Sequence, residues 1–227
     1  MRVRLRGSIS LNLLTLWSFD ELSRVDLNLP KSTEINKFVA KTNFYKRATI
    51  TPKIHDLIEQ QVDRITWTNK VAPTTMNISS DDILEFQIFH IQLKTPDIDN
   101  AILVFMQKSV PYPILFVIQG ARGVRGAAVT KNADSKPVTL ATDWQSDLLL
   151  DIKGSSTDNI YKNYLLQLSS SFAAVGGDAE KHSEATKLKR TIDALSAKIK
   201  RETQVNKRQE LARERHELEI KLGELIR

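Results

Sequence analysis

Residues 85–119 read EFQIFHIQLKTPDIDNAILVFMQKSVPYPILFVIQ, and this stretch decides the fold. Its first ten residues are rich in β-branched and aromatic side chains, so they predict a strand whose side chains alternate between two faces. Residues 96–106 then place apolar side chains at helical spacing, and residues 112–119 form a continuous apolar run typical of a strand buried on both faces. The predicted core is therefore strand, helix and strand.

The flanking regions add helices and strands without strict alternation. Thr51 before Pro52 is a good N-cap, and apolar residues then recur at helical spacing, which predicts a helix over residues 52–65. Further on, the sequence predicts a turn, a strand and a helix at residues 120–126, 137–144 and 155–168. This mixture favours an α+β fold over a doubly wound sheet.

Composition divides the chain into four segments. Residues 1–26 carry Arg2, Arg4 and Arg6 followed by an apolar run, and we interpret them as an amphipathic N-terminal extension rather than a targeting signal. Residues 27–168 form the predicted compact α+β domain of mixed sheet and helices, and residues 169–177 (SSSFAAVGG) form a flexible linker. Residues 178–227 are predicted to form one long basic coiled-coil helix. No segment has the roughly 20 apolar residues that span a bilayer, so no membrane association is expected.

The C-terminal segment has a narrow apolar seam and contains neither Gly nor Pro between residues 178 and 222. Its predicted coiled-coil interface consists of Leu188, Ile192, Leu195, Ile199, Leu211, Leu218, Leu222 and Leu225. A continuous helix of about 45 residues would extend about 70 Å, and a seam of that length needs a partner helix. We therefore predict a homo-oligomer or pairing with a helix of another protein. The pattern leaves open whether the helix is continuous or folds back near Val205.

The composition excludes several kinds of chemistry. The chain has no cysteine, which rules out disulfides, thiolate metal sites and cysteine nucleophiles and favours a cytoplasmic location. Its four histidines are far apart and have no metal-ligand spacing, so we expect neither a metal site nor a cofactor. No G-x-S-x-G motif occurs, and no catalytic residue is assigned. The sequence therefore favours a protein that is not an enzyme.

Basic residues concentrate in the C-terminal segment. Residues 187–208 contain the eight cations Lys187, Lys189, Arg190, Lys198, Lys200, Arg201, Lys207 and Arg208. Two acids, Asp193 and Glu202, lower the net charge of this segment to +6 (8 − 2), which equals that of the whole chain. Such a stripe predicts non-specific contact with DNA phosphates. The alternative is the charged outer face of an ordinary coiled coil.

Two further groups of residues suggest phosphate chemistry. Arg122 and Arg125 lie in the glycine-rich turn GARGVRG, where backbone amides and guanidinium groups could bind a phosphate, although a plain hairpin turn also explains this motif. Asp82 and the later Gln92-Leu93-Lys94 resemble the acid and Glu-x-Lys of restriction-type nucleases. Because Gln92 supplies no second carboxylate for Mg²⁺, this alternative is a degenerate or metal-dependent nuclease that uses Asp82 and Lys94.

Four segments carry a resemblance to a known family: LNLPKSTEINK, RITWTNKVAPTTMNI, PYPILFVI and ETQVNKRQELARERHEL. From residue 27 to residue 227 the chain resembles the uncharacterised bacterial domain-of-unknown-function family numbered 4391. Such proteins are often encoded beside helicases and DNA methyltransferases in restriction-like defence islands. The resemblance therefore implies a non-enzymatic accessory subunit of a DNA-related, anti-phage system, with a helicase or methyltransferase as partner. A purely structural coiled-coil adaptor is the remaining alternative.

Overall fold

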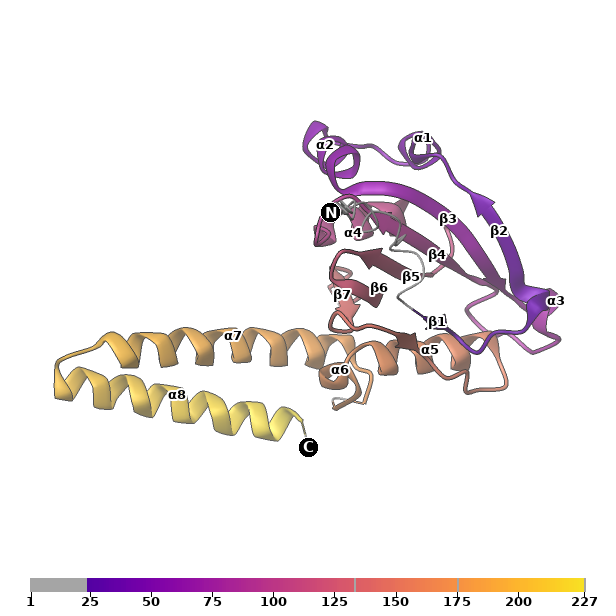
Figure 1. Ribbon diagram of the computed structural model, residues 1–227. Helices are drawn as coiled ribbons and strands as arrows, with labels where there is room; N and C mark the ends of the chain where they lie inside the picture. The colour runs from indigo at the N-terminus through magenta and orange to yellow at the C-terminus, as the bar shows by residue number, and fades with distance from the viewer. Residues whose placement is uncertain (1–23, 133, 175, 227) are drawn as a thin grey trace, which may run out of the picture.

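The computed structural model describes residues 24–226 except residues 133 and 175. A body of sheet and helices fills one end of the molecule, and a pair of long helices projects from it (Figure 1). Most of the predicted N-terminal extension, residues 1–23, lies outside the described residues. The α+β class predicted from the sequence is confirmed.

The body is built on a mixed sheet of six strands in the order β2-β3-β4-β5-β6-β7. The strands are β2 (Glu34–Phe38), β3 (Val62–Val71), β4 (Phe86–Leu93), β5 (Ile114–Gly120), β6 (Gly123–Lys131) and β7 (Pro137–Ala141). All neighbours are antiparallel except β4 and β5, which run parallel because helix α4 (Asn100–Ser109) carries the chain back between them. The predicted strand, helix and strand form the centre of the fold.

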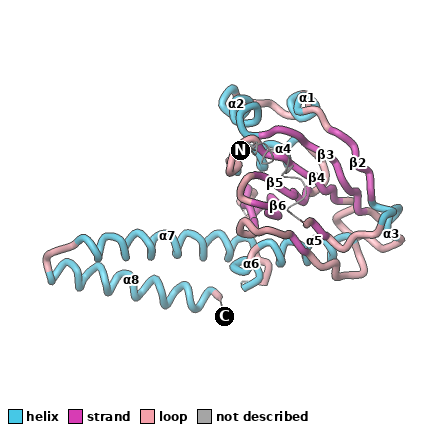
Figure 2. The backbone as a smooth tube through the Cα atoms, viewed as in Figure 1, coloured by secondary structure: helices cyan, strands magenta, loops and turns pink. Residues whose placement is uncertain are grey.

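One face of the sheet is covered by α1 (Lys41–Tyr45), α2 (Pro52–Gln61) and α4 (Figure 2). Phe89 and Ile91 of β4 point to this face, as the alternation within residues 85–94 predicted. Thr51 caps α2, since its Oγ1 accepts a hydrogen bond from the Ile54 amide at 3.4 Å.

Helix α2 ends four residues earlier than the sequence predicted. Val62 and Ile65 continue the helical spacing, but they pair instead with Leu93 and Ile91 in the sheet. Both side chains are buried, so the gain from packing within the sheet outweighs local helix propensity.

The opposite face is covered by α5 (Thr157–Leu168), which packs on Phe86 and Ile88 of β4. The buried Tyr164 hydroxyl donates a hydrogen bond to the Leu27 carbonyl oxygen at 2.6 Å. Asp158 in the first turn accepts hydrogen bonds from three successive backbone amides in the loop before β4, at residues 81–83. Burial alone would raise the pKa of Asp158, but these donors together lower it below its ordinary value. Asp158 thereby fixes the loop that enters the central strand.

Short elements complete the body. Strand β1 (Val25–Asp26) pairs in parallel with β8 (Leu148–Leu149), so the body includes Val25 and Asp26, which the sequence analysis assigned to the N-terminal extension. A 3₁₀ turn, η2 (Lys31–Thr33), and a short helix, α3 (Pro73–Met76), flank the ends of β2 and β3.

Two long helices follow the body. Helix α6 (Ser170–Ala174) occupies part of the segment predicted as a linker, and its Phe172 ring meets the His182 ring of α7 edge-on at 5.5 Å. Helix α7 (Ala179–Arg201) then leads away from the body, and α8 (Val205–Leu225) runs back beside it (Figure 1). Of the two arrangements that the sequence left open, the segment has the one that folds back near Val205, so it is a helical hairpin and not one continuous helix. None of the described helices is long and apolar enough to cross a membrane.

Candidate functional site

The hairpin covers its own apolar seam. Leu195 is 4% exposed, and the other seven predicted seam residues are half buried. The chain reverses at residues 202–204, where Glu202 Oε1 accepts a hydrogen bond from the Gln204 amide at 2.8 Å. The polar interval at residues 203–209, which interrupts the seam, marks this reversal in the sequence. The partner helix that the seam requires is therefore supplied, at least on one side, by α8 itself.

The reversal concentrates positive charge at the end of the hairpin farthest from the body, which we call the hairpin tip (residues 198–208; Figure 1). Its five cations are all exposed: Lys198, Lys200, Arg201, Lys207 and Arg208. Glu202 is the one acid among these residues, so the net charge of the tip is +4 (5 − 1). Within the described hairpin, the ion pairs are those of Glu219 with Arg215 and His216, which leave the tip cations unneutralised.

The other predicted basic residues of the hairpin lie closer to the body. Lys187, Lys189 and Arg190 are exposed in the first half of α7. The sequence after the tip adds no positive surplus, because residues 209–227 contain five acids and four Lys or Arg residues. The charge asymmetry therefore distinguishes the tip from the rest of the hairpin.

Arg122, in the turn between β5 and β6, and Arg125, within β6, both lie beside Trp144. Their guanidinium carbons lie 5.6 and 5.4 Å from the centre of the Trp144 ring. Asp97 lies between them, with carboxylate oxygens 2.9 Å from Arg122 Nη1 and 3.8 Å from Arg125 Nη1. Burial lowers the pKa of Arg125, and Asp97 opposes this shift. This geometry is that of a hairpin turn stabilised by an ion pair and cation–π contacts, with one cation already neutralised.

The residues of the nuclease alternative do not meet. Asp82 precedes β4 and Lys94 follows it, and the eight intervening strand residues separate them by about 26 Å. Lys94 Nζ donates a hydrogen bond to the Glu59 carbonyl oxygen at 3.0 Å, on the side of the body where α2 ends. Among the described residues, no cluster of three or more His, Asp or Glu side chains could hold a metal ion. The geometry therefore gives no support to a shared site of Asp82 and Lys94.

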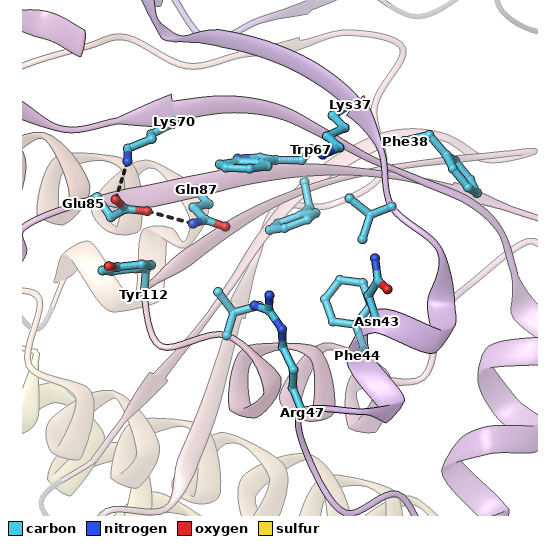
Figure 3. A pocket seen from close by; sticks show the side chains of 13 residues that line it. Lys37, Phe38, Asn43, Phe44, Arg47, Trp67, Lys70, Glu85, Gln87 and Tyr112 are labelled. Carbon is cyan, nitrogen blue, oxygen red and sulfur yellow. Dashed lines mark hydrogen bonds and ion pairs between the residues drawn. The ribbon is translucent and has the colours of Figure 1, made fainter. Parts of the chain in front are cut away.

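A pocket with a polar inner end opens at the other end of β4, between the sheet and α1 (Figure 3). Its volume is about 430 Å³, and it is lined by β2, β3, β4, α1 and the segment between α4 and β5. Lys70 Nζ lies 2.7 Å from Glu85 Oε2, and Gln87 Nε2 donates a hydrogen bond to Glu85 Oε1 at 2.8 Å. Glu85 and Gln87 are each only 9% exposed, although both are polar.

Sequence reasoning did not assign this pocket, although one signal was available. The alternation of β4 places Glu85 and Gln87 on the same face as Phe89 and Ile91, so two polar side chains were expected at the buried end of an apolar face. Lys70 precedes Glu85 by 15 positions, and only the register of β3 on β4, with Lys70 opposite Gln87, brings it into contact. Periodicity within one segment cannot supply that register.

Comparison with curated proteins and with solved structures finds no match to this chain. A family model described as "Domain of unknown function (DUF4391)" matches residues 27–222, which include the body from Leu27 onward and nearly the whole hairpin. The match covers far more than half of the sequence and includes the four segments that carried the resemblance. The chain therefore belongs to this family of domains of unknown function.

Proposed function

We propose that this protein is a non-enzymatic accessory subunit that contacts DNA phosphates through the hairpin tip and binds a partner protein. The observation that carries the proposal is the gathering of five exposed cations, with one acid, where the hairpin reverses. Exposed Lys and Arg side chains neutralise phosphates and release counterions, which drives binding that is independent of sequence. The 23 residues of α7 extend about 34 Å, so the tip can reach a duplex without interference from the body.

The proposed partner class follows from the family resemblance. Proteins of this kind are expected beside helicases and DNA methyltransferases of defence systems, and such an enzyme would supply the chemistry. The hairpin would hold the partner or a second copy of this chain, while its tip adds non-specific affinity for DNA. A cytoplasmic location is part of this proposal.

The DNA contact can be tested by removing the tip charges. Replacing Lys198, Lys200, Arg201, Lys207 and Arg208 by Gln removes five charges and keeps good helix propensity. We expect the affinity for a duplex at low salt to fall at least about tenfold, and the dependence of log affinity on log salt to become shallower by about 0.9 for each lost phosphate contact. Fluorescence anisotropy with a labelled duplex at increasing KCl concentrations measures both quantities.

A matched control removes the same charge elsewhere. It replaces five exposed cations of the body by Gln: Lys31, Lys46, Lys53, Lys108 and Lys131. This control should bind DNA much as the wild-type chain does. If both variants lose DNA affinity equally, binding depends on the net charge of the protein, and the tip is not the DNA contact. Absence of DNA binding by the wild-type chain at low salt would favour the purely structural adaptor.

Self-association of the hairpin is the second expected property. A pair of helices buries only one side of each, and Ile220 on α8 remains 50% exposed with apolar neighbours that are half buried. A second hairpin can cover these residues in a four-helix arrangement. We expect multi-angle light scattering to give a dimer at about 50 µM. The Ile220→Gln variant should be a monomer. A wild-type monomer under these conditions would instead assign the surface to a helix of another protein.

A further inference from the structure

The pocket beneath α1 has an unbalanced charge. Three cations line it, Lys37, Arg47 and Lys70, against the single acid Glu85, so the local net charge is +2 (3 − 1). Glu85 is already paired with Lys70. Lys37 and Arg47 form no ion pair with any residue in the described part of the chain, and the Arg47 guanidinium points into the pocket (Figure 3). Two cations are therefore available to a ligand of charge about −2, the charge of a phosphate monoester near neutral pH.

The inner wall presents a hydrogen-bond acceptor of fixed orientation. Glu85 is a carboxylate held by Lys70, and a carboxylate only accepts hydrogen bonds. Gln87 must therefore direct its amino group to Glu85, which leaves its carboxamide oxygen facing the pocket (Figure 3). The contacts from Lys70 to Glu85 and from Glu85 to Gln87 thus place a hydrogen-bond acceptor, the Gln87 carboxamide oxygen, at the bottom of the pocket. A ligand that fills this end must donate a hydrogen bond there.

The remaining walls are flat and largely apolar. Trp67 and Phe89 line the pocket from the sheet and Phe44 lines it from α1. Tyr112 lies near Glu85 (Figure 3). Trp67 and Phe89 already stack, with ring centres 6.4 Å apart and ring planes 19° apart. Phe44 and Phe89 are each 4% exposed and pack edge-on with ring centres 5.8 Å apart, so Trp67, which is half buried, offers the aromatic surface for a planar heterocycle. A volume of about 430 Å³ is in the range of pockets that enclose one small ligand.

From this arrangement we propose that the pocket binds a nucleoside monophosphate unit whose base carries an exocyclic amino group, as adenine and cytosine do. Arg47 and Lys37 contact the phosphate, and the base lies against Trp67 with its amino group donating to Gln87. The unit can be a free nucleotide or the unpaired, 5′-phosphorylated end of a DNA strand. This site is independent of the hairpin tip.

Isothermal titration calorimetry of the full-length chain at low salt tests the ligand class. The probes are AMP and CMP, their counterparts IMP and UMP that lack the amino group, adenosine, and inorganic phosphate. We expect AMP or CMP to bind at least about tenfold more tightly than its counterpart, because the counterpart leaves the Gln87 oxygen unpaired. Adenosine and inorganic phosphate should each bind at least about tenfold more weakly than AMP, because each lacks half of the contacts. Equal affinity for the amino-bearing and amino-lacking nucleotides, or no binding of any probe, would overturn the proposal.

Two variants locate the binding in this pocket. Arg47→Gln should weaken AMP binding at least about tenfold, whereas Lys46→Gln, an equal charge change at the adjacent exposed residue that does not line the pocket, should not weaken it. Gln87→Met should abolish the preference for AMP over IMP. Circular dichroism establishes that all three variants are folded. Unchanged AMP binding by folded Arg47→Gln would place the nucleotide elsewhere and refute this site.

A further pair of measurements separates the two sources of the nucleotide unit. A 5′-phosphorylated trinucleotide that binds more tightly than AMP assigns the site to a strand end, and equal or weaker binding assigns it to a free nucleotide. The variant that lacks the five tip charges should bind AMP as the wild-type chain does. Failure of DNA binding at the tip and failure of nucleotide binding in the pocket are therefore distinguishable outcomes.

Discussion

The Lys70→Met variant is expected to lose about 3 kcal/mol of unfolding free energy, because it leaves the Glu85 carboxylate buried without its cation. The Glu85 side chain is 11% exposed and that of Lys70 31%, so water replaces the lost partner at Glu85 only in part. The cost of burying an unpaired charge is larger than the small net gain of an exposed ion pair. Urea unfolding monitored by tryptophan fluorescence measures the change, since Trp67 and Trp144 lie in the body.

The double variant Lys70→Met, Glu85→Leu separates charge burial from packing. Removing both charges leaves Gln87 as the polar group at the bottom of the pocket, and we expect most of the lost stability to return. Lys46→Met, at an exposed position outside the pocket, should stay within about 0.5 kcal/mol of the wild-type chain. If Lys70→Met is as stable as the wild-type chain, the ion pair with Lys70 does not stabilise Glu85, and the fixed orientation of Gln87 loses its basis.

Lys70 and Glu85 also show how far the sequence alone could predict the site. Within one segment, periodicity was informative: the two faces of β4 and the N-cap Thr51 were predicted and are present. A contact between segments depends on strand register, which a hydrophobic pattern specifies only coarsely. The contact of Lys70 with Glu85 depends on such a register. The sequence could therefore indicate that polar residues of the pocket are buried, but it could not predict which of them contact each other.

The C-terminal segment shows the same limit for helices. The seam correctly indicated a partner helix, but a heptad pattern does not state whether that partner belongs to the same chain. The reversal at residues 202–204 contains neither Gly nor Pro, so the usual signals of a turn are absent. The polar interval alone left a continuous helix and a hairpin open, and packing between the helices decides between them.

The Leu195→Asp variant is expected to separate the two hairpin helices while the body stays folded. Leu195 is 4% exposed at the centre of the seam, and a carboxylate there would lose apolar burial and meet no cation from the other seam residues. Together these effects lower the stability of the hairpin by about 3 kcal/mol or more. In this chain the two helices pack mainly on each other, so we expect them to separate. Hydrogen exchange measured by mass spectrometry should show loss of protection along both helices and unchanged protection in β4 and β5.

Ala194→Asp supplies the matched control, because residue 194 is exposed on the same turn of α7 and receives the same charge. Its helices should remain protected. If Leu195→Asp also retains full protection, the helices do not depend on the packing of Leu195 in this seam. If the helices separate as expected, the chain reversal no longer gathers the five tip cations, so DNA affinity should fall in Leu195→Asp and not in Ala194→Asp. These two results together would show that packing of the apolar seam maintains the hairpin, and that the hairpin is needed for the proposed contact with DNA.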